Sequence, residues 1–294
     1  MDPKLRTDGL GGDGAAGSDG GDPAPEVLPL REGAKRRSGA IQVLQRADAF
    51  LDAVARSQTP LSGAALARQV GLNKSTTFNI LSTLVELGYL TVSLETRHYR
   101  LGPRVLQLSS VFRSTSQWTT IAGPFLYSLR DETRETVSIH VRAGWERVCV
   151  AQASSLQSIT RVIELGRRRP LYAGAAGAVL LASLDDAQLE IFLSKIDLRP
   201  LTPNSVTDIA TLRRKIEHVR RQGFAAAYEE AEVGVSALSV PIRDQAGFID
   251  AALVVSGPAN RYNRQAVQQT LAATKAAAAE LSREAGHAYA IPTE

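Results

Sequence analysis

Apolar residues recur at three- and four-residue spacing through the first third of the chain, in three successive stretches. The first stretch predicts a helix from about Gly39, with a buried face of Ile41, Leu44, Ala47, Leu51 and Val54. Thr59-Pro60 ends it. A short helix follows Ser62 and ends at Gly71, since glycine readily leaves a helix through a left-handed conformation. These two helices are predicted to pack together.

A third, longer helix is predicted over Lys74–Leu87. Asn73 precedes it and can accept hydrogen bonds from the free backbone N–H groups of its first turn. Its apolar stripe consists of Thr77, Ile80, Leu81 and Leu84. A short helix, a tight glycine turn and a longer helix over residues 62–87 are typical of a helix-turn-helix, in which the start of the second helix enters the major groove.

Two short β-prone stretches follow this motif, YLTVS and RHYRL, around a turn near Leu94–Thr96. They predict a hairpin over residues 89–101 that would serve as the wing of a winged helix-turn-helix. From this arrangement we predict DNA contacts by residues exposed on the second helix and near the tip of the wing: Lys74, Ser75, Thr76, Phe78, Asn79, Ser82, Arg97 and His98.

The remainder of the chain predicts a mixed α/β fold. A helix over Pro103–Ser116 leads into an amphipathic segment from Trp118 to Glu135. We then expect strands and helices that form an antiparallel sheet flanked by helices. The predicted strands are Thr136–Arg142, Arg147–Ala153, Ile159–Ile163, Ser236–Arg243 and Phe248–Ser256, and the predicted helices are Gly174–Ser183, Asp186–Ser194, Asp208–Gln222 and Asn263–Ala285.

Charge is distributed unevenly along the 294 residues. Residues 31–113 carry 12 basic and 5 acidic side chains, a net charge of +7, whereas residues 114–294 carry 20 basic and 19 acidic ones. A basic segment that coincides with the helix-turn-helix favours a nucleic-acid partner. Residues 1–38 are rich in Gly, Asp, Pro and Ala and predict a disordered tail ending in Lys35-Arg36-Arg37, which is either a DNA contact or a solvated linker.

Several classes of protein are disfavoured. Cys149 is the single cysteine, which fits a reducing cytoplasm and a buried thiol, and the four histidines have no metal spacing, so we expect neither metal nor cofactor. No nucleophile–base pair is visible, so we expect no enzyme and no catalytic residues. Apolar runs such as Ala175–Ala182 are too short to span a bilayer, and the start of the chain lacks the pattern of a secretory signal.

The sequence over residues 40–285 resembles the IclR family of bacterial transcriptional regulators. The segments that carry the resemblance, in the family's order and spacing, are GAALARQVGLNKSTTFNILSTLVELGYL, ETVSIHV, RRPLYAGAAGAVLLASL and RRQGFAAAYEEAEVGVSALSVPIRDQAGFIDAALVVSGP. The resemblance implies a winged helix-turn-helix domain over 39–101, a linker helix over 102–118 and a GAF-like α/β domain over 119–288 that binds an effector and oligomerises. Two positions depart from the family pattern, Asn79 in place of Arg and Ala178 in place of Lys.

The resemblance also implies an effector site in the second domain for a small acidic or aromatic metabolite. The residues it assigns are Gly174, Ala175, Ala176, Gly177, Tyr228, Glu229, Gly234 and Ser256. A small-residue loop entering a helix exposes backbone N–H groups suited to a carboxylate, although the same residues also suit a tightly packed helix. Arg167-Arg168-Arg169 is either a solvated turn or a guard at the ligand entrance.

The expected function is a ligand-responsive regulator that binds double-stranded promoter DNA and controls a metabolic operon. We expect a homodimer or tetramer, because the helix over residues 103–116 has an apolar stripe and because two winged helices bind a palindrome better than one. The alternative is a DNA-binding protein whose second domain only oligomerises. The effector, the target genes and the direction of control are open at this point.

Overall fold

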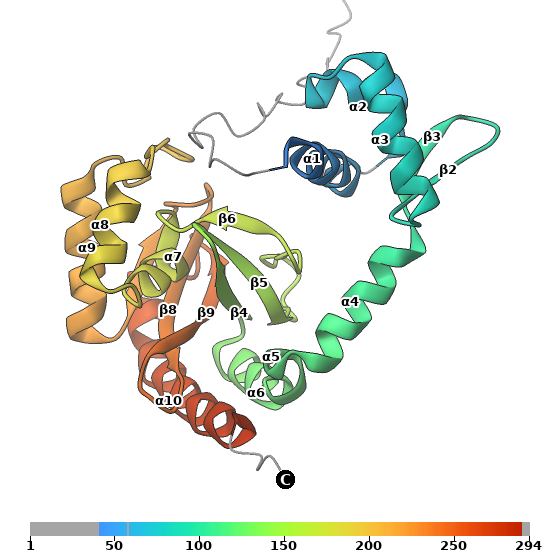
Figure 1. The fold of residues 1–294 in the computed structure, drawn as a ribbon. Coiled ribbons are helices and arrows are strands. Elements are labelled where there is room, and N and C mark those ends of the chain that lie inside the picture. Colours follow the sequence, from blue (N-terminus) through green and yellow to red (C-terminus); the bar gives the residue numbers. More distant parts are fainter. Residues whose placement is uncertain (1–40, 58, 290–294) are drawn as a thin grey trace, which may run out of the picture. The chain divides into compact units, whose positions relative to one another are not determined.

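The computed structural model describes residues 41–57 and 59–289, and Figure 1 shows their arrangement in helices and strands. The predicted tail over 1–38, with Lys35-Arg36-Arg37, lies outside the described residues. The chain divides into two compact units between Leu108 and Ser109, within helix α4 (Pro103–Thr115). The helix predicted over residues 103–116 is therefore present and runs from one unit into the other.

The N-terminal unit contains three helices, α1 (Gln42–Arg56), α2 (Gly63–Val70) and α3 (Lys74–Glu86). The predicted caps are confirmed: Ser62 accepts a hydrogen bond from the Ala65 amide and Asn73 accepts one from the Thr76 amide. Gly71 ends α2 with φ at 70°, in the left-handed region that favours glycine.

The core of this unit includes Phe50, Leu66 and Leu81, each fully buried. The predicted stripe of α3 is confirmed, because Thr77, Ile80, Leu81 and Leu84 are all buried. The predicted face of α1 is partly wrong. Val54 is buried and Ala47 and Leu51 are half-buried, as predicted, whereas Ile41 and Leu44 are exposed. Phe50, which was not predicted, is fully buried in the core.

The wing is a three-stranded antiparallel sheet in the order β1-β3-β2. Strands β2 (Leu90–Val92) and β3 (His98–Leu101) form the predicted hairpin. The additional strand β1 (Leu61–Ser62) pairs with β3, and its two residues are too few to give a pattern in the sequence. This sheet fixes the hairpin against the helices.

The C-terminal unit is built on six antiparallel strands in the order β6-β5-β4-β9-β8-β7. In chain order they are β4 (Thr136–Ala143), β5 (Glu146–Ala153), β6 (Arg168–Pro170), β7 (Ala225–Tyr228), β8 (Val235–Arg243) and β9 (Ile249–Pro258). The predicted mixed fold with an antiparallel sheet and flanking helices is therefore correct.

Helices cover both faces of this sheet (Figure 1). One face packs against α7 (Gly174–Leu181), α8 (Asp186–Lys195) and α9 (Ile209–Gln222), and the other against α5 (Gln117–Ile121), α6 (Gly123–Thr133) and α10 (Arg264–Tyr289). Residues alternate between the two cores along β9, with Ala252 and Val254 facing α7 and Leu253 and Val255 facing the other side.

The strand predicted over Ile159–Ile163 is wrong. These residues lie in a loop, and the edge strand beside β5 is formed by Arg168–Pro170. Of the apolar residues in this segment, Ile159 and Val162 are exposed to solvent and only Ile163 is buried. This loop carries Arg161 into the candidate pocket.

Candidate DNA-reading helix and effector pocket

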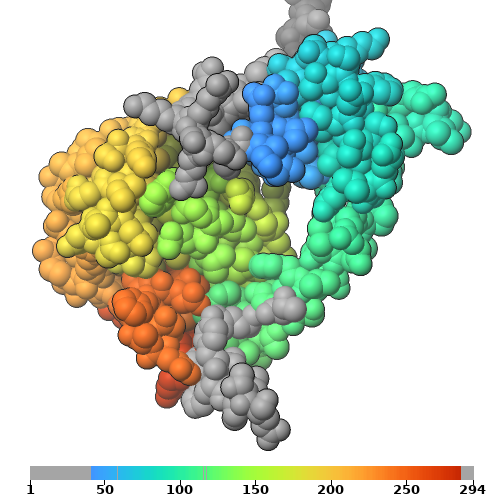
Figure 2. Space-filling model, viewed as in Figure 1, coloured from blue at the N-terminus to red at the C-terminus, as the bar shows by residue number. Residues whose placement is uncertain are grey.

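The α3 helix presents most of its predicted DNA-reading residues to solvent. Lys74, Ser75, Phe78, Asn79 and Ser82 are exposed, and Thr76 is half-buried. Figure 2 shows that the segment from α2 to α3, in cyan, lies at the surface of its unit. Because Asn79 and Phe78 lie opposite the buried stripe, their side chains are available to the edges of base pairs.

The first turn of α3 is ordered by hydrogen bonds. The Asn73 side-chain oxygen accepts hydrogen bonds from the Ser75 hydroxyl and the Thr76 amide. Ser75 is therefore already engaged in the cap, whereas the Lys74 side chain extends into solvent next to the positive end of the helix dipole. That end of the helix suits a phosphate.

The tip of the wing carries Arg97 and His98, as the sequence predicted. Arg97 is exposed and adopts the left-handed conformation, with φ at 55°. His98 Nδ1 lies 2.6 Å from the Thr96 carbonyl oxygen, which can only accept, so Nδ1 carries the proton. The Nε2 atom of His98 makes no hydrogen bond with a described residue, and the wing therefore offers one cation and one imidazole nitrogen.

In the C-terminal unit, a cavity of about 70 Å³ lies between α7 and the sheet. Its walls come from the start of α7, from all six strands of the sheet, from the loop before β6 and from the segment after β7. The lining residues include His140, Arg147, Arg161, Arg169, Gly174 and Ser256.

The start of α7 exposes its backbone to this cavity. Gly174 adopts a φ of 73°, and the residue before it, Ala173, provides no side-chain hydrogen bond to the first turn. Ala175 and Ala176 also line the cavity, and their small side chains leave the helix end accessible. A helix N-terminus without a side-chain cap favours an anion.

Two buried polar atoms at the cavity lack a partner among the described residues. They are Ser256 Oγ and Arg147 Nε. Ser256 is only 3% exposed, so its hydroxyl has no ready access to bulk water. An unsatisfied buried polar group costs about 1–3 kcal/mol, and such groups commonly mark the place of a bound molecule.

A buried imidazole orients Arg147. Arg147 Nη1 lies 3.1 Å from His140 Nδ1, and a guanidinium can only donate, so His140 accepts at Nδ1 and donates from Nε2 to Ser138 Oγ at 3.1 Å. Burial and the nearby arginines hold the pKa of His140 well below its usual value, so the ring is neutral. Burial also lowers the pKa of Arg147 to about 10, and the guanidinium remains charged at neutral pH.

Three more arginines lie at the cavity. Arg161 and Arg169 both bind Glu232, at 2.8 Å and 2.6 Å, and Arg167 is exposed at the edge. Burial lowers the pKa values of Arg161 and Arg169, and the nearby Arg167 lowers them further, whereas Glu232 acts in the opposite direction. Of the three arginines in this turn, Arg167 and Arg169 line the cavity, whereas Arg168 does not and pairs with Glu146.

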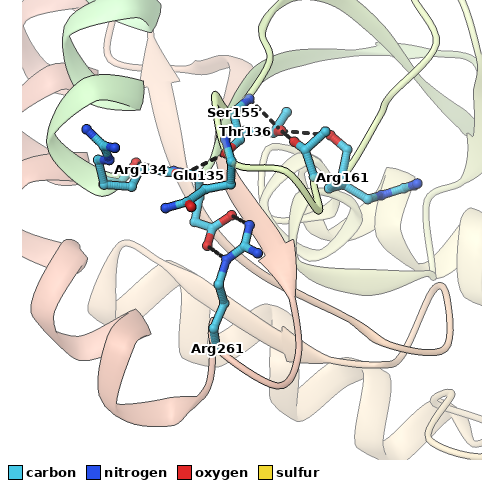
Figure 3. Close-up of polar contacts among 9 residues, drawn as sticks. Arg134, Glu135, Thr136, Ser155, Arg161 and Arg261 are labelled. Carbon is cyan, nitrogen blue, oxygen red and sulfur yellow. Dashed lines mark hydrogen bonds and ion pairs between the residues drawn. The ribbon is translucent and has the colours of Figure 1, made fainter.

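Figure 3 shows how the loop before β6 is held. The Thr136 hydroxyl, at the start of β4, donates to the Arg161 carbonyl at 2.7 Å and accepts from the Ser155 amide at 3.1 Å. The Ser155 hydroxyl in turn donates to the carbonyl of Arg134, which ends α6. The loop that carries Arg161 is therefore connected to both α6 and β4.

The structure brings together only part of the effector site that the resemblance implied. Gly174, Ala175, Ala176 and Ser256 line the cavity, and the other four residues do not. A Cβ at Gly177 would lie 1.9 Å from the Leu171 carbonyl oxygen, so this glycine allows close packing. Tyr228 faces the opposite core, beneath Arg264, and Glu229 accepts a hydrogen bond from the Gly234 amide in the β7–β8 turn.

Sequence reasoning missed His140, Arg147 and Arg161 as lining residues of the cavity. Ser138, His140 and Arg147 occupy alternate positions on neighbouring strands, and Ser256 lies opposite Thr136 in the register of β4 and β9. Polar residues on one face of otherwise apolar strands were the available signal. The predicted burial of Cys149 is confirmed, and burial raises its pKa to about 12.

Comparisons with known proteins agree with this architecture. Residues 43–93 match the IclR helix-turn-helix domain, and residues 114–283 match the bacterial transcriptional regulator IclR C-terminal domain. The chain is 31% identical over 220 residues to the HTH-type transcriptional repressor AllR of Salmonella typhimurium, a match that covers 75% of this chain and 81% of the relative.

The chain belongs to the IclR family of bacterial transcriptional regulators. Its relatives and matching domains are transcriptional regulators and not enzymes. The structure is similar to that of a transcriptional regulator from Rhodococcus sp. RHA1, with a TM-score of 0.71, 30% identity, and coverage of 85% of this chain and 100% of the other.

A second similar structure is an IclR homologue from Microbacterium hydrocarbonoxydans in complex with 4-hydroxybenzoate. The TM-score is 0.67 at 24% identity, with 83% of this chain and 98% of the other covered. In this IclR-family chain, no helix of the described part is long and apolar enough to cross a membrane. Nor does any group of three or more His, Cys, Asp and Glu in that part come close enough together to hold a metal ion.

Proposed function

We propose that this IclR-type regulator binds promoter DNA and changes its DNA affinity when a small acidic metabolite enters the cavity beside α7. The observation that carries the proposal is that one cavity contains two buried polar atoms without a partner among the described residues, Ser256 Oγ and Arg147 Nε. The proposed target is a metabolic, catabolic operon, because the proposed signal is a metabolite.

The size of the cavity supports a small effector. At roughly 10–15 Å³ for each water-sized group, 70 Å³ holds about five to seven such groups. The 4-hydroxybenzoate bound to the Microbacterium homologue supports a carboxylate as the recognised group. Ala176 at the cavity wall leaves room for a ligand at the start of α7.

DNA binding is assigned to the segment over residues 39–101. Lys74, Ser75 and Thr76 would contact phosphates or bases at the start of α3, with Phe78, Asn79 and Ser82 facing the groove and Arg97 and His98 at the wing. The net charge of +7 over residues 31–113 supports a large contribution from phosphate contacts. Affinity for a selected duplex is expected to fall steeply between about 50 and 200 mM salt.

The regulator is proposed to act as a homodimer in the cytoplasm, with the helix over 102–118 joining the DNA-binding domain to an effector and oligomerisation domain over 119–288. A palindromic operator presents the same half-site twice, and a dimer contacts both halves. An effector alters DNA affinity only if it binds one arrangement of the dimer better than another.

The test is a titration of a DNA duplex, selected from random sequences by the protein itself, in the presence of a panel of small mono- and dicarboxylates. A coupling of about 1–3 kcal/mol predicts a 5- to 150-fold change in DNA affinity for the effective acid. Ala176→Phe should abolish that response and retain DNA binding, because the ring fills the cavity. Ala187→Phe, at an exposed position on α8, is the matched control.

An Ala176→Phe protein that still responds at normal acid concentration would locate the effector elsewhere. Absence of any response in the wild-type protein across the panel would favour a second domain that only oligomerises. A variant that loses DNA binding altogether would indicate that Ala176 serves packing rather than ligand binding.

A further inference from the structure

Arg147 is a half-buried cation with a buried Nε atom, and it has no carboxylate partner among the described residues. The only hydrogen bond of its guanidinium with a described residue goes to the neutral His140, and Nε has none. A Cβ at Gly174 would lie 3.9 Å from Arg147 Nη2, so the guanidinium lies directly beside the start of α7. Keeping a charge in such a place is unfavourable unless an anion joins it.

The remaining charges around the cavity do not balance either. Four arginines line it, together with two glutamates. Glu230 is already paired with Lys215, and Glu232 is shared between Arg161 and Arg169. The four guanidinium groups therefore face a single available carboxylate. The positive charges of Arg161, Arg167 and Arg169 repel that of Arg147.

We propose that the effector of this pocket is a dianion, with one acidic group bound by Arg147, Ser256 and the start of α7, and a second acidic group bound by Arg167 and Arg169. This inference rests on the proposed function, in which the cavity is the effector site. A monoanion would leave two guanidinium groups without a counter-ion, whereas a dianion leaves one, and Arg167 is hydrated at the edge.

The two acidic groups have different surroundings. The inner group enters a closed environment in which Ser256 Oγ, Arg147 Nε and the first-turn N–H groups of α7 all donate. The outer group meets Arg169, which is already bonded to Glu232, and Arg167, which makes no ion pair with a described residue. Arg167 is thus the cation most available to distinguish a dianion from a monoanion.

The experiment compares diacids with their monoamides, which have the same shape and one charge fewer. Oxalate and oxamate, malonate and malonamate, and succinate and succinamate are titrated into the full-length protein by calorimetry at constant ionic strength. We expect the best diacid to bind at least tenfold more tightly than its monoamide. Arg147→Gln should abolish binding of both members of that pair.

Arg167→Gln and Arg168→Gln provide a matched pair of variants, since both remove one charge from the same turn but only Arg167 lines the cavity. Arg167 is exposed, so its replacement should not impair folding. Arg167→Gln should reduce the preference for diacid over monoamide by at least threefold, and Arg168→Gln should leave it unchanged.

The outcomes separate this inference from the proposed function. Binding of a monoamide as tightly as its diacid, or of monoamides alone, would overturn the dianion and leave an acid-binding pocket. Failure of all six acids to bind would overturn both. An equal loss of preference in both variants would show that charge in the turn acts at long range and not by contact, which would remove Arg167 from the site.

Discussion

The Thr136 hydroxyl lies 2.7 Å from the backbone carbonyl of Arg161, although 25 residues separate the two. The same hydroxyl accepts the Ser155 amide, so one side chain holds both ends of the loop that carries Arg161 to the pocket. Because Thr136 is fully buried, water cannot replace these bonds. The position of an arginine that lines the cavity thus depends on the first residue of β4.

Thr136→Val should destabilise the protein by about 1–3 kcal/mol, because it keeps the side-chain shape and leaves buried polar groups of the loop without a partner. The measurement is the free energy of unfolding from urea denaturation of the C-terminal transition. Thr136→Ser retains the hydroxyl and should recover most of the loss. A valine variant as stable as wild type would show that the loop is held by other contacts.

The neutral His140 makes stability depend on pH. Its pKa in the folded protein lies well below 6.5, its value in the unfolded chain. At pH values between these two pKa values, His140 binds a proton in the unfolded state but not in the folded state. Stability therefore falls as the pH falls through this range, by about 1.4 kcal/mol between pH 7.5 and 5.5.

This contribution can be isolated with His140→Gln, which cannot titrate. Urea denaturation at pH 7.5 and 5.5 should show that wild type loses about 1.4 kcal/mol more than the variant over this interval. Equal losses in the two proteins would mean that His140 is protonated in the folded state, and would contradict the hydrogen-bond assignment in which Arg147 donates to it.

Successive side chains of a strand point to opposite faces of the sheet, and this alternation explains which parts of the site could be predicted. Ser256 was predicted at the pocket and lies on the α7 face of β9, together with Val254. Tyr228 follows Ala227 on β7, and Ala227 faces the pocket, so Tyr228 must face the other core. The strand β7 was not predicted from the sequence, and without it the direction of Tyr228 could not be derived.

The charge of the pocket depends on contacts that no local pattern contains. Arg161 was assigned to a strand that the structure does not contain. Arg147 was assigned to a strand, but the sequence did not show which helices pack against the face that carries it. Glu232 binds arginines 71 and 63 residues away in sequence. The helix-turn-helix, in contrast, depends on caps and stripes within 25 residues, and it was predicted almost completely.

Gly177→Ala should destabilise the C-terminal unit by about 3 kcal/mol or more. A Cβ there would lie 1.9 Å from the Leu171 carbonyl oxygen, and a rigid backbone cannot yield as a side chain would. Gly123→Ala is the control, because a Cβ at that helical position meets nothing within 4 Å. The control should be neutral or slightly stabilising in urea denaturation.

Asn79 and Lys74 should affect DNA recognition differently. Asn79→Ala is expected to cost about 1–3 kcal/mol at one base pair and to relax sequence preference there, because an amide can bind adenine through two hydrogen bonds. Lys74→Ala should weaken all sequences about equally. The measurement is selection from random duplexes, followed by affinities for single-base variants. An unchanged sequence preference in the Asn79 variant would show that Asn79 does not contribute to base recognition.

The last prediction concerns assembly through α4. Leu106 is 73% exposed and Leu108 is 43% exposed on this helix. The two side chains lie about 200° apart around the helix axis, so apolar surface is exposed on two sides of it. A second copy of the chain is the partner that would cover it in a regulator reading a palindrome. We expect wild type to sediment at twice the 31.5 kDa mass of one chain, or a multiple of it, at micromolar concentration.

Leu106→Glu should shift this equilibrium toward the single chain and weaken binding to a palindromic duplex, with little effect on a half-site. Gln107→Glu adds the same charge at the next position, about 100° around the helix, and is the matched control. Sedimentation equilibrium with and without DNA measures both. A wild-type protein that remains a single chain under both conditions would contradict the dimer. A Leu106→Glu protein that still dimerises would mean that other surfaces hold the copies together.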